Sequence, residues 1–274
     1  MTAIPPDLPR HPRASTVRVT GPSGQLPLTV MEYDGTRPFV LLHGGGGAAT
    51  MAGFAALLAD RAHARVLLPT HPGFMGTPRP ETLASTRDLA RCYVGLFDEL
   101  DLTDVIVVGN SFGGWLAAEI ALLGSPRVGE VVVVDGVGIQ VNGHPVTNVR
   151  GLAPQELQKL SFHDPSRAPR PPGGAGSGPS PDLAALLAYT GPDMADPTLA
   201  GRLGALAVRA HVIWGESDGI VDTTFGKAFA DAMPNASFTV LPGTGHLPQV
   251  ETPEDLLAAL LDLVGVSPRA RLAG

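Results

Sequence analysis

The stretch VIVVGNSFGGW, residues 105–115, decides the fold of this chain because it joins a buried strand to a helix through a serine placed between glycines. The run VIVV is typical of a strand that is covered on both faces of a sheet. Residues 109–113 form the pattern G-x-S-x-G, whose tight turn raises the hydroxyl of Ser111 above the sheet. The glycines lack Cβ atoms, so neighbouring backbone can approach closely. The stretch therefore predicts an exposed nucleophile in front of a helix N-terminus.

Apolar runs typical of buried strands alternate along the chain with helical patterns, and this alternation favours a mostly parallel sheet with helices on both faces. We expect a hairpin of two strands at 16–20 and 26–33, followed by strands that end in the sequences LLHGGGG, VLLP, VIVVG, VVVVDG, VIWG and TVLPG. Helices are expected at residues 50–62, 82–99, 113–124, 223–233 and 252–265. The sequence therefore predicts an α/β fold with a mostly parallel sheet of the eight-stranded type.

The alternation of strands and helices stops between residues 137 and 205. Within this stretch the sequence PSRAPRPPGGAGSGPSP, residues 165–181, is too rich in proline and glycine to form regular structure. Short helices are expected on either side of it, at 153–162 and 181–190. We interpret residues 137–205 as a cap or lid inserted into a core made of residues 1–136 and 206–274. A linker between two domains is the alternative, but neither half would then hold a complete sheet.

The composition argues against several classes of function. The chain has 274 residues and a formal net charge of -7, and without a Lys/Arg cluster it lacks the basic face that a nucleic-acid partner requires. The single cysteine, Cys92, excludes an intrachain disulfide. The N-terminus lacks the apolar region of a secretory signal, and no run of about 18 apolar residues could span a membrane. We expect a soluble cytoplasmic protein, monomeric or homodimeric, with no membrane partner.

The hydroxyl of Ser111 needs a base, and the base needs an orienting acid, before the serine can act as a nucleophile. Histidine suits this task because its ordinary pKa of about 6.5 lies near neutrality. Of the eight histidines, His246 has the most suitable position, in the loop after the late strand of LPGTGH. His43 also ends a strand, but it precedes the glycine run, where we expect it to shape the loop. Asp218 after VIWG is the expected acid, and Asp135 after VVVV is the alternative.

The glycine run at residues 44–47 is suited to present backbone N–H groups to a developing negative charge. Such charge grows on the carbonyl oxygen when a serine attacks it, and one well-placed donor is worth about 3 kcal/mol. We expect the N–H groups of Phe112 and Gly45 in this role, with Gly46 as the alternative to Gly45. A phosphate-binding loop is the other interpretation, but the chain has neither the G-x-x-x-x-G-K-[ST] pattern nor the context of G-x-G-x-x-G.

The motifs LLHGGGG, HPGFMGTPRP, VVGNSFGG, WGESDGIV and LPGTGHLPQVETPE together resemble those of the α/β-hydrolase superfamily, from residue 15 to residue 265. The resemblance implies an α/β-hydrolase sheet with a cap inserted after the sixth strand. It implies Ser111 as nucleophile, His246 as base and Asp218 as acid, with an oxyanion hole from the amides of Gly45 and Phe112 and with no metal or cofactor. The glycine- and proline-rich middle of the cap departs from the compact helical caps that are common in the family.

Relatives that resemble this chain and carry a serine at this position include carboxylesterases, lactonases, cofactor-free perhydrolases and hydrolases of carbon–carbon bonds. We expect hydrolysis of a small or medium uncharged carboxylic ester or lactone, a small-molecule substrate, through an acyl-enzyme. One alternative is a carbon–carbon bond hydrolase of ring-cleavage diketone acids, and another is a non-catalytic small-molecule receptor on the same fold. The residues expected to line the pocket, with core packing as the alternative role for the apolar ones, are Gly46, Phe74, Met75, Trp115, Phe162, Leu186, Tyr189 and Met194.

Overall fold

The computed structural model describes residues 11–22, 24–169 and 181–265, which contain one eight-stranded sheet. The strand order is β1-β2-β4-β3-β5-β6-β7-β8. Strands β1 and β2 form an antiparallel hairpin, β2 pairs antiparallel with β4, and all other neighbours are parallel. This confirms the predicted α/β fold with a mostly parallel sheet. The strands are β1 Arg13–Gly21, β2 Gly24–Tyr33, β3 Pro38–Leu42, β4 Arg65–Pro69, β5 Val105–Asn110, β6 Val128–Val134, β7 Arg209–Gly215 and β8 Ala236–Leu241.

Burial explains why the central and outer strands differ in sequence. Every residue of β3 and of β5 is buried, because helices cover both faces of the sheet there, and both strands are accordingly near-continuous apolar runs. The outer strand β2 instead alternates exposed with buried residues from its second to its seventh position, as a strand does when one face is solvated. The sheet thus places the strands that precede the glycine-rich turns at its buried centre.

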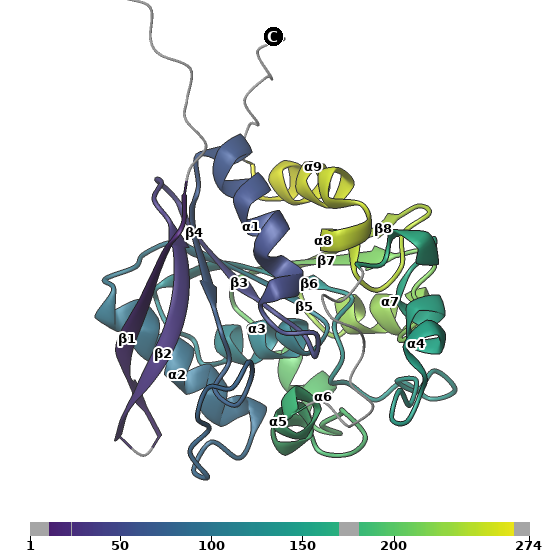
Figure 1. Ribbon diagram of the computed structural model, residues 1–274, viewed down its shortest axis with the longest axis horizontal. Helices are drawn as coiled ribbons and strands as arrows, with labels where there is room; N and C mark the ends of the chain where they lie inside the picture. The colour runs from purple at the N-terminus through teal and green to yellow at the C-terminus, as the bar shows by residue number, and fades with distance from the viewer. Residues whose placement is uncertain (1–10, 23, 170–180, 266–274) are drawn as a thin grey trace, which may run out of the picture.

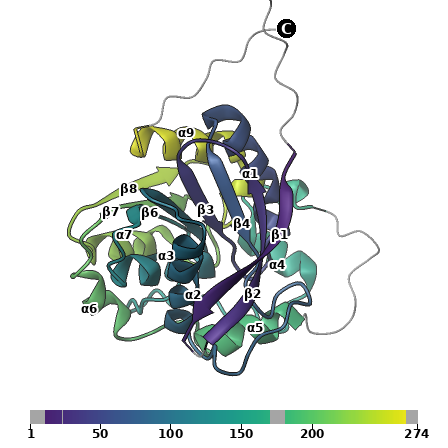
Figure 2. The ribbon, with the colours of Figure 1, turned by 90° about the vertical axis from the view of Figure 1, so that its left-hand side faces the viewer.

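The helices divide the interior into two apolar cores, one on each face of the sheet. Helices α2, α3 and α7 supply side chains to one core, and α1 and α9 supply the other. Figure 1 shows α1 and α9 together above the sheet, with α2 and α3 below it, and Figure 2 shows the same layers from the side of the β1–β2 hairpin. The helices described outside the segment between β6 and β7 are α1 Ala49–Ala62, α2 Thr86–Glu99, α3 Phe112–Leu122, α7 Thr223–Asp231, α8 Pro248–Glu251 and α9 Pro253–Leu263.

In the described residues of the segment between β6 and β7 there are three short helices and one 3-10 turn. They are α4 Pro154–Ser161, the 3-10 turn η1 Pro165–Arg167, α5 Pro181–Thr190 and α6 Leu199–Leu203. The expectation that 165–181 lacks regular structure is wrong at 165–167, because the Asp164 carboxylate accepts the Ser166 amide and stabilises a turn there. Residues 170–180 lie outside the described part. The sequence did not predict α6, which has only five residues. Among the helices described, none is long and apolar enough to cross a membrane.

Two glycines inside helices offer a matched test of how closely those helices pack. A Cβ atom at Gly95 in α2 would lie 2.4 Å from the carbonyl oxygen of Thr20 in β1, whereas a Cβ atom at Gly53 in α1 would meet nothing within 4 Å. We expect Gly53→Ala to raise the free energy of unfolding by up to about 1 kcal/mol, because alanine favours the helix and restricts the unfolded chain. Gly95→Ala should lower it by about 1–3 kcal/mol, since α2 must move off the hairpin.

Urea unfolding of the two variants beside the wild type measures both effects. If Gly95→Ala stabilises the protein as much as Gly53→Ala does, α2 does not pack against β1 at the distance described.

Candidate active site

Ser111 is the single residue between β5 and α3. Its backbone is strained, with φ of 57° and ψ of -119°. This conformation is rare for a residue with a side chain. The turn is held in place because Gly113, at the start of α3, lies directly against β3: a Cβ atom at Gly113 would be 2.1 Å from the carbonyl oxygen of Leu42. The sequence therefore folds locally into a strand–serine–helix turn that points the serine away from the end of the sheet.

Asp218 and His246 meet at the neighbouring end of the sheet, in the loops after β7 and β8. The Nδ1 of His246 lies 2.7 Å from the Oδ2 of Asp218, and both residues are 6% exposed. The Oδ1 of Asp218 accepts the amides of Ile220 at 2.8 Å and Val221 at 3.1 Å. An imidazole that donates through Nδ1–H to a carboxylate keeps Nε2 free to accept a proton. Asp135, the alternative acid of the sequence analysis, contacts the Gly215 amide instead of this histidine.

Asn110 and Gln249 connect the serine turn to the histidine loop, and the sequence analysis missed both. The Nδ2 of Asn110, the residue before Ser111, donates to the His246 carbonyl at 3.0 Å, and the Nε2 of Gln249 donates to the Oδ1 of Asn110 at 3.0 Å. A polar side chain at the end of a fully buried strand must find a partner, and this was the available signal. In the described residues no hydrogen bond joins the Ser111 hydroxyl to the His246 ring; in unliganded sites such bonds commonly tighten only around substrate.

The glycine loop after β3 passes directly beside Ser111. A Cβ atom at Gly44 would lie 2.8 Å from the Cβ of Ser111, so Gly44, which no sequence pattern singled out, is the glycine of this loop that contacts the serine. The α-carbon of Gly45 faces Leu186 of α5, and that of Gly46 faces Thr50 of α1. Phe112 opens α3, and the first amides of a helix have no partner within the helix. The loop and the helix start thus bring backbone donors to the region of Ser111.

Two buried histidines brace the back of this loop. The Nδ1–H of His43 donates to the Gly44 carbonyl at 2.8 Å, and its Nε2 accepts the His71 amide at 3.1 Å. Burial lowers the pKa of His43 to about 4, and burial followed by the neighbouring His43 lowers that of His71 well below its ordinary value. Both rings are therefore neutral at pH 7 and act as fixed hydrogen-bonding groups that shape the loop.

The other residues predicted to line the pocket lie in different environments. Phe74 is fully buried and packs edge-on against His43, while the Tyr189 ring of α5 stacks on Phe112 at 5.8 Å between centroids. Met75 is 57% exposed. Trp115, Phe162 and Leu186 are buried, and Met194 borders the cavity described next.

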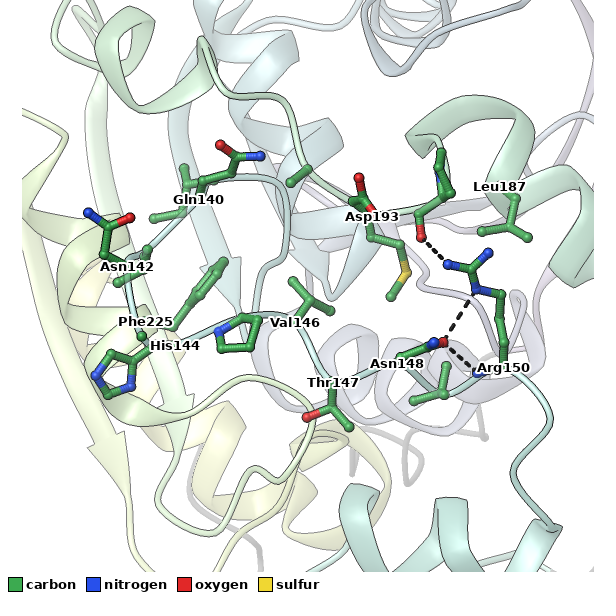
Figure 3. Close-up of a pocket in the computed structure, with 18 of the residues that line it drawn as sticks. Gln140, Asn142, His144, Val146, Thr147, Asn148, Arg150, Leu187, Asp193 and Phe225 are labelled. Carbon is green, nitrogen blue, oxygen red and sulfur yellow. Dashed lines mark hydrogen bonds between the residues drawn. The ribbon is translucent and has the colours of Figure 1, made fainter.

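A cavity of about 610 Å³ lies under the segment that follows β6. Figure 3 shows residues 140–150 curving around it, with Phe225 and His144 at one end and Leu187 and Arg150 at the other. Of the predicted pocket residues only Met194 lines it, and neither Ser111 nor His246 does. The lining segment begins at Ile139, two residues after Val137, whose amide donates to the Ser111 carbonyl at 3.3 Å. The lining of the cavity therefore begins two residues from a backbone contact with Ser111, but it does not include Ser111.

The C-terminal end of α4 holds both the acid loop and the histidine loop. The carbonyl of Leu160 accepts the Gly219 amide at 2.9 Å, and the carbonyl of Ser161 accepts the His246 amide at 2.9 Å. Through these two bonds the segment between β6 and β7 holds the backbone of His246 and of Gly219, the residue after Asp218.

The carboxylate of Glu251 strengthens the same junction. It is 4% exposed and accepts three amides: those of Gly245 at 2.7 Å, Asp164 at 2.7 Å and His163 at 3.1 Å. Glu251 thus fixes the residue before His246 against the residues after α4. The sequence analysis did not identify it, because its partners are backbone groups far away in the chain.

No group of three or more His, Cys, Asp or Glu side chains in the residues that the structure describes could hold a metal ion. The chemistry available at the site is that of a hydroxyl, an imidazole paired with a carboxylate, and free backbone amides. Together these groups can support attack of an oxygen nucleophile on a carbonyl carbon.

Comparisons with known proteins agree with the geometry. Residues 39–260 match the model of a family described as the alpha/beta hydrolase family. A 2-hydroxy-6-oxononadienedioate/2-hydroxy-6-oxononatrienedioate hydrolase of Paraburkholderia phymatum is 30% identical, over 84% of this chain and 88% of its own length. The dihydrolipoyllysine-residue acetyltransferase component of the acetoin cleaving system of Pseudomonas putida is 28% identical over 83% of this chain, which spans 63% of that relative. The structure of a thermophilic esterase from Thermogutta terrifontis has the same fold, with a TM-score of 0.69 and 22% identity over 92% of this chain and 98% of the esterase.

The role of Glu251 can be tested by Glu251→Gln, because an amide can accept through only one of its two ends. One of the three amides then loses its partner, and we expect the free energy of unfolding to fall by about 1–3 kcal/mol. Hydrogen exchange should become faster at Gly245 and His246 and also at His163 and Asp164. The matched control is Glu254→Gln, which removes a more exposed ion pair with Arg61 and should cost less than about 1 kcal/mol. Faster exchange in only one of the two segments would contradict the junction.

Proposed function

The chain belongs to the alpha/beta hydrolase family and is a hydrolase, and on this premise we propose that it cleaves a small or medium uncharged carboxylic ester or lactone through an acyl-enzyme on Ser111. The observation that carries the proposal is the pairing of a strained serine turn with the 2.7 Å bond between His246 and the buried Asp218. A serine held this way beside an acid–base pair is the arrangement that nucleophilic acyl transfer needs.

In the proposed acylation step, Nε2 of His246 takes the Ser111 proton while the Ser111 oxygen attacks the ester carbonyl. The Asp218 carboxylate stabilises the imidazolium that forms, and it holds the ring through Nδ1. Negative charge develops on the former carbonyl oxygen, where the amides of Phe112 and Gly45 are the proposed donors, each worth about 3 kcal/mol. His246 then gives its proton to the leaving alcohol, and the acyl group remains on Ser111.

In the proposed deacylation step, a water molecule replaces the alcohol. His246 takes a proton from this water, which attacks the acyl carbonyl, and the same backbone donors stabilise the second oxyanion. Collapse of this intermediate returns the proton to the Ser111 oxygen and releases the carboxylic acid. The base is thereby restored to its neutral form for the next cycle.

We assign residues 137–205 as the cap that selects the substrate. This assignment is supported by the position of α5, whose Leu186 faces Gly45 and whose Tyr189 stacks on Phe112, the two residues of the proposed oxyanion hole. Apolar side chains there favour an uncharged acyl or aromatic group. Phe74, Trp115 and Phe162 are proposed as further apolar walls, and Met75 and Met194 as more peripheral contacts.

A carbon–carbon bond hydrolase is the second candidate, and Arg150 favours it. The relative from Paraburkholderia phymatum is named for a dienedioate, which is an anion. Arg150 lies in the wall of the cavity, where its guanidinium donates to neutral oxygens, those of the Asn148 side chain at 3.3 Å and the Pro192 carbonyl at 2.8 Å. A guanidinium whose described partners are neutral keeps its charge available for a carboxylate.

The nucleophile can be tested with a chain-length series of nitrophenyl esters. We expect Ser111→Ala to lower kcat/KM by about 10³-fold or more, since the nucleophile and its proton are lost. A fluorophosphonate probe should label the wild type on the peptide that contains Ser111, and it should not label the variant. Ser15→Ala, at an exposed serine in β1, is the matched control and should behave like the wild type. Equal hydrolysis by Ser111→Ala and the wild type would remove Ser111 from the proposal.

The two substrate classes can be separated at Arg150. If the substrate is a dienoate, Arg150→Gln should raise KM for that substrate about tenfold or more, because a charged hydrogen bond is lost, and it should leave neutral esters unchanged. Arg18→Gln, at an exposed arginine in β1, is the control. Turnover of nitrophenyl esters together with no turnover of dienoates by the wild type would exclude the carbon–carbon bond reaction.

A further inference from the structure

Asp135 is a buried acid for which the proposed mechanism has no use. It follows β6 in a left-handed backbone conformation, with φ of 47°, and it is completely buried. Its Oδ1 accepts the Gly215 amide at 2.7 Å. Among the described residues no donor reaches its Oδ2, so an ionised Asp135 would leave this oxygen without a hydrogen bond. A buried carboxylate oxygen without a donor is costly, so this oxygen requires an explanation.

The neighbour of Asp135 is a second acid, Asp218. Strands β6 and β7 are parallel neighbours, and the Asp135 amide donates to the Ile213 carbonyl at 3.0 Å, so the two acids leave adjacent strand ends. Gly215 links the two acids, because its amide donates to Asp135 Oδ1 at 2.7 Å and its carbonyl accepts the Asp218 amide at 3.3 Å, and the two carboxyl groups interact electrostatically. Two carboxyl groups this close in a buried place cannot both be ionised, and such a pair shares a proton.

The number of hydrogen-bond donors decides which of the two acids holds the proton. Asp218 accepts from three groups, the amides of Ile220 and Val221 and the Nδ1–H of His246, whereas Asp135 accepts only from Gly215. Donors stabilise the charged form of a carboxyl group, so the shared proton belongs on Asp135, which has fewer donors. Burial, and then the negative charge of Asp218, raise the pKa of Asp135 well above its ordinary value.

We propose that Asp135 is a neutral carboxylic acid in the folded protein and that its Oδ2–H donates a hydrogen bond to Asp218. The proton gives the otherwise unpartnered Oδ2 a role, and it adds a fourth donor to the Asp218 carboxylate. In the described residues the titratable groups that face Asp135 are Asp218 and, behind it, His246; β7 contributes only the backbone of Ile213 and Gly215.

Asp135 is then a positioning residue, since it acts on the reaction only through Asp218. Its hydrogen bond restricts rotation of the Asp218 carboxylate and keeps Oδ2 directed at His246. This consequence for turnover rests on the proposed function, while the protonation of Asp135 does not.

Proton release on unfolding tests the protonation without any substrate. The wild type holds a proton at Asp135 between pH 5 and 8, whereas an unfolded aspartate, with a pKa of about 3.9, has lost it. Unfolding therefore releases this proton, and stability falls as pH rises through this window. Asp135→Asn removes this release. The measured quantity is the unfolding equilibrium constant of the wild type divided by that of the variant, and this ratio should increase about tenfold per pH unit between pH 5 and 8. The same ratio at every pH in this window would overturn the proposal.

Asp196→Asn is the matched control for proton release. Burial opposes ionisation of Asp196, but hydrogen bonds from Thr198 and Arg202 lower its pKa below the ordinary value. Asp196 is therefore ionised in both states above pH 5, and its variant should show no change of proton release in this window. If Asp135→Asn does not fold, carbon-13 NMR of labelled aspartate carboxyls in the wild type takes its place: one carboxyl should keep the protonated shift at pH 7. A spectrum in which all of them are ionised would overturn the proposal.

The positioning role has its own measurement in kcat/KM. Asparagine can imitate a protonated aspartic acid, because its Nδ2–H can donate to Asp218 while its Oδ1 accepts the Gly215 amide. We expect Asp135→Ala to lower kcat/KM about tenfold or more and asparagine to restore most of that loss. A loss of about 10⁴-fold in Asp135→Asn would instead identify Asp135 as an ionised acid of the reaction and overturn the assignment. Failure of the wild type to hydrolyse any ester would contradict only the proposed function, because proton release is measured independently.

Discussion

The architecture of the site depends on backbone segments that touch one another at the carboxyl edge of the sheet. A Cβ atom at Gly215, the last residue of β7, would lie 2.1 Å from the carbonyl oxygen of Gly245, and Gly113 is equally close to the end of β3. Where two backbones meet this closely, only glycine fits. The serine turn, the acid loop and the histidine loop can therefore converge within a small volume, although residue 111 lies far along the chain from residues 218 and 246.

Convergence of the backbone buries polar groups, and most of them are paired. Asn110 binds the His246 carbonyl, Glu251 accepts three amides, and the end of α4 accepts the amides of Gly219 and His246. Each of these bonds removes the cost of burying its groups, and together they leave the imidazole little freedom to move. Because α4 belongs to the segment between β6 and β7, a displacement of that segment would also displace the groups proposed to carry the chemistry.

The proposed chemistry and the choice of substrate reside in different parts of the molecule. A serine, an imidazole and backbone donors at the sheet edge suit any reaction in which an oxygen nucleophile attacks a carbonyl, which includes both ester cleavage and carbon–carbon cleavage of a diketone. The apolar side chains of α5 and the guanidinium of Arg150 differ in the groups that they would accept. We therefore propose that specificity is set by the segment between β6 and β7 rather than by the serine turn.

The sequence by itself determined the features that depend on neighbouring residues in the chain. The alternation of apolar runs with helical patterns predicted the α/β sheet, and the spacing of Gly109, Ser111 and Gly113 predicted the strand–serine–helix turn, because both depend on local conformation. The tertiary structure decided the features that depend on distance. It placed Asp218 rather than Asp135 against His246, put Gly44 beside Ser111, and recruited Asn110, Gln249 and Glu251 as supports. Each of these contacts joins groups that meet only when the sheet has formed, so a position at or after a strand end could suggest Asp218 and Asn110 as candidates but could not decide which groups they contact.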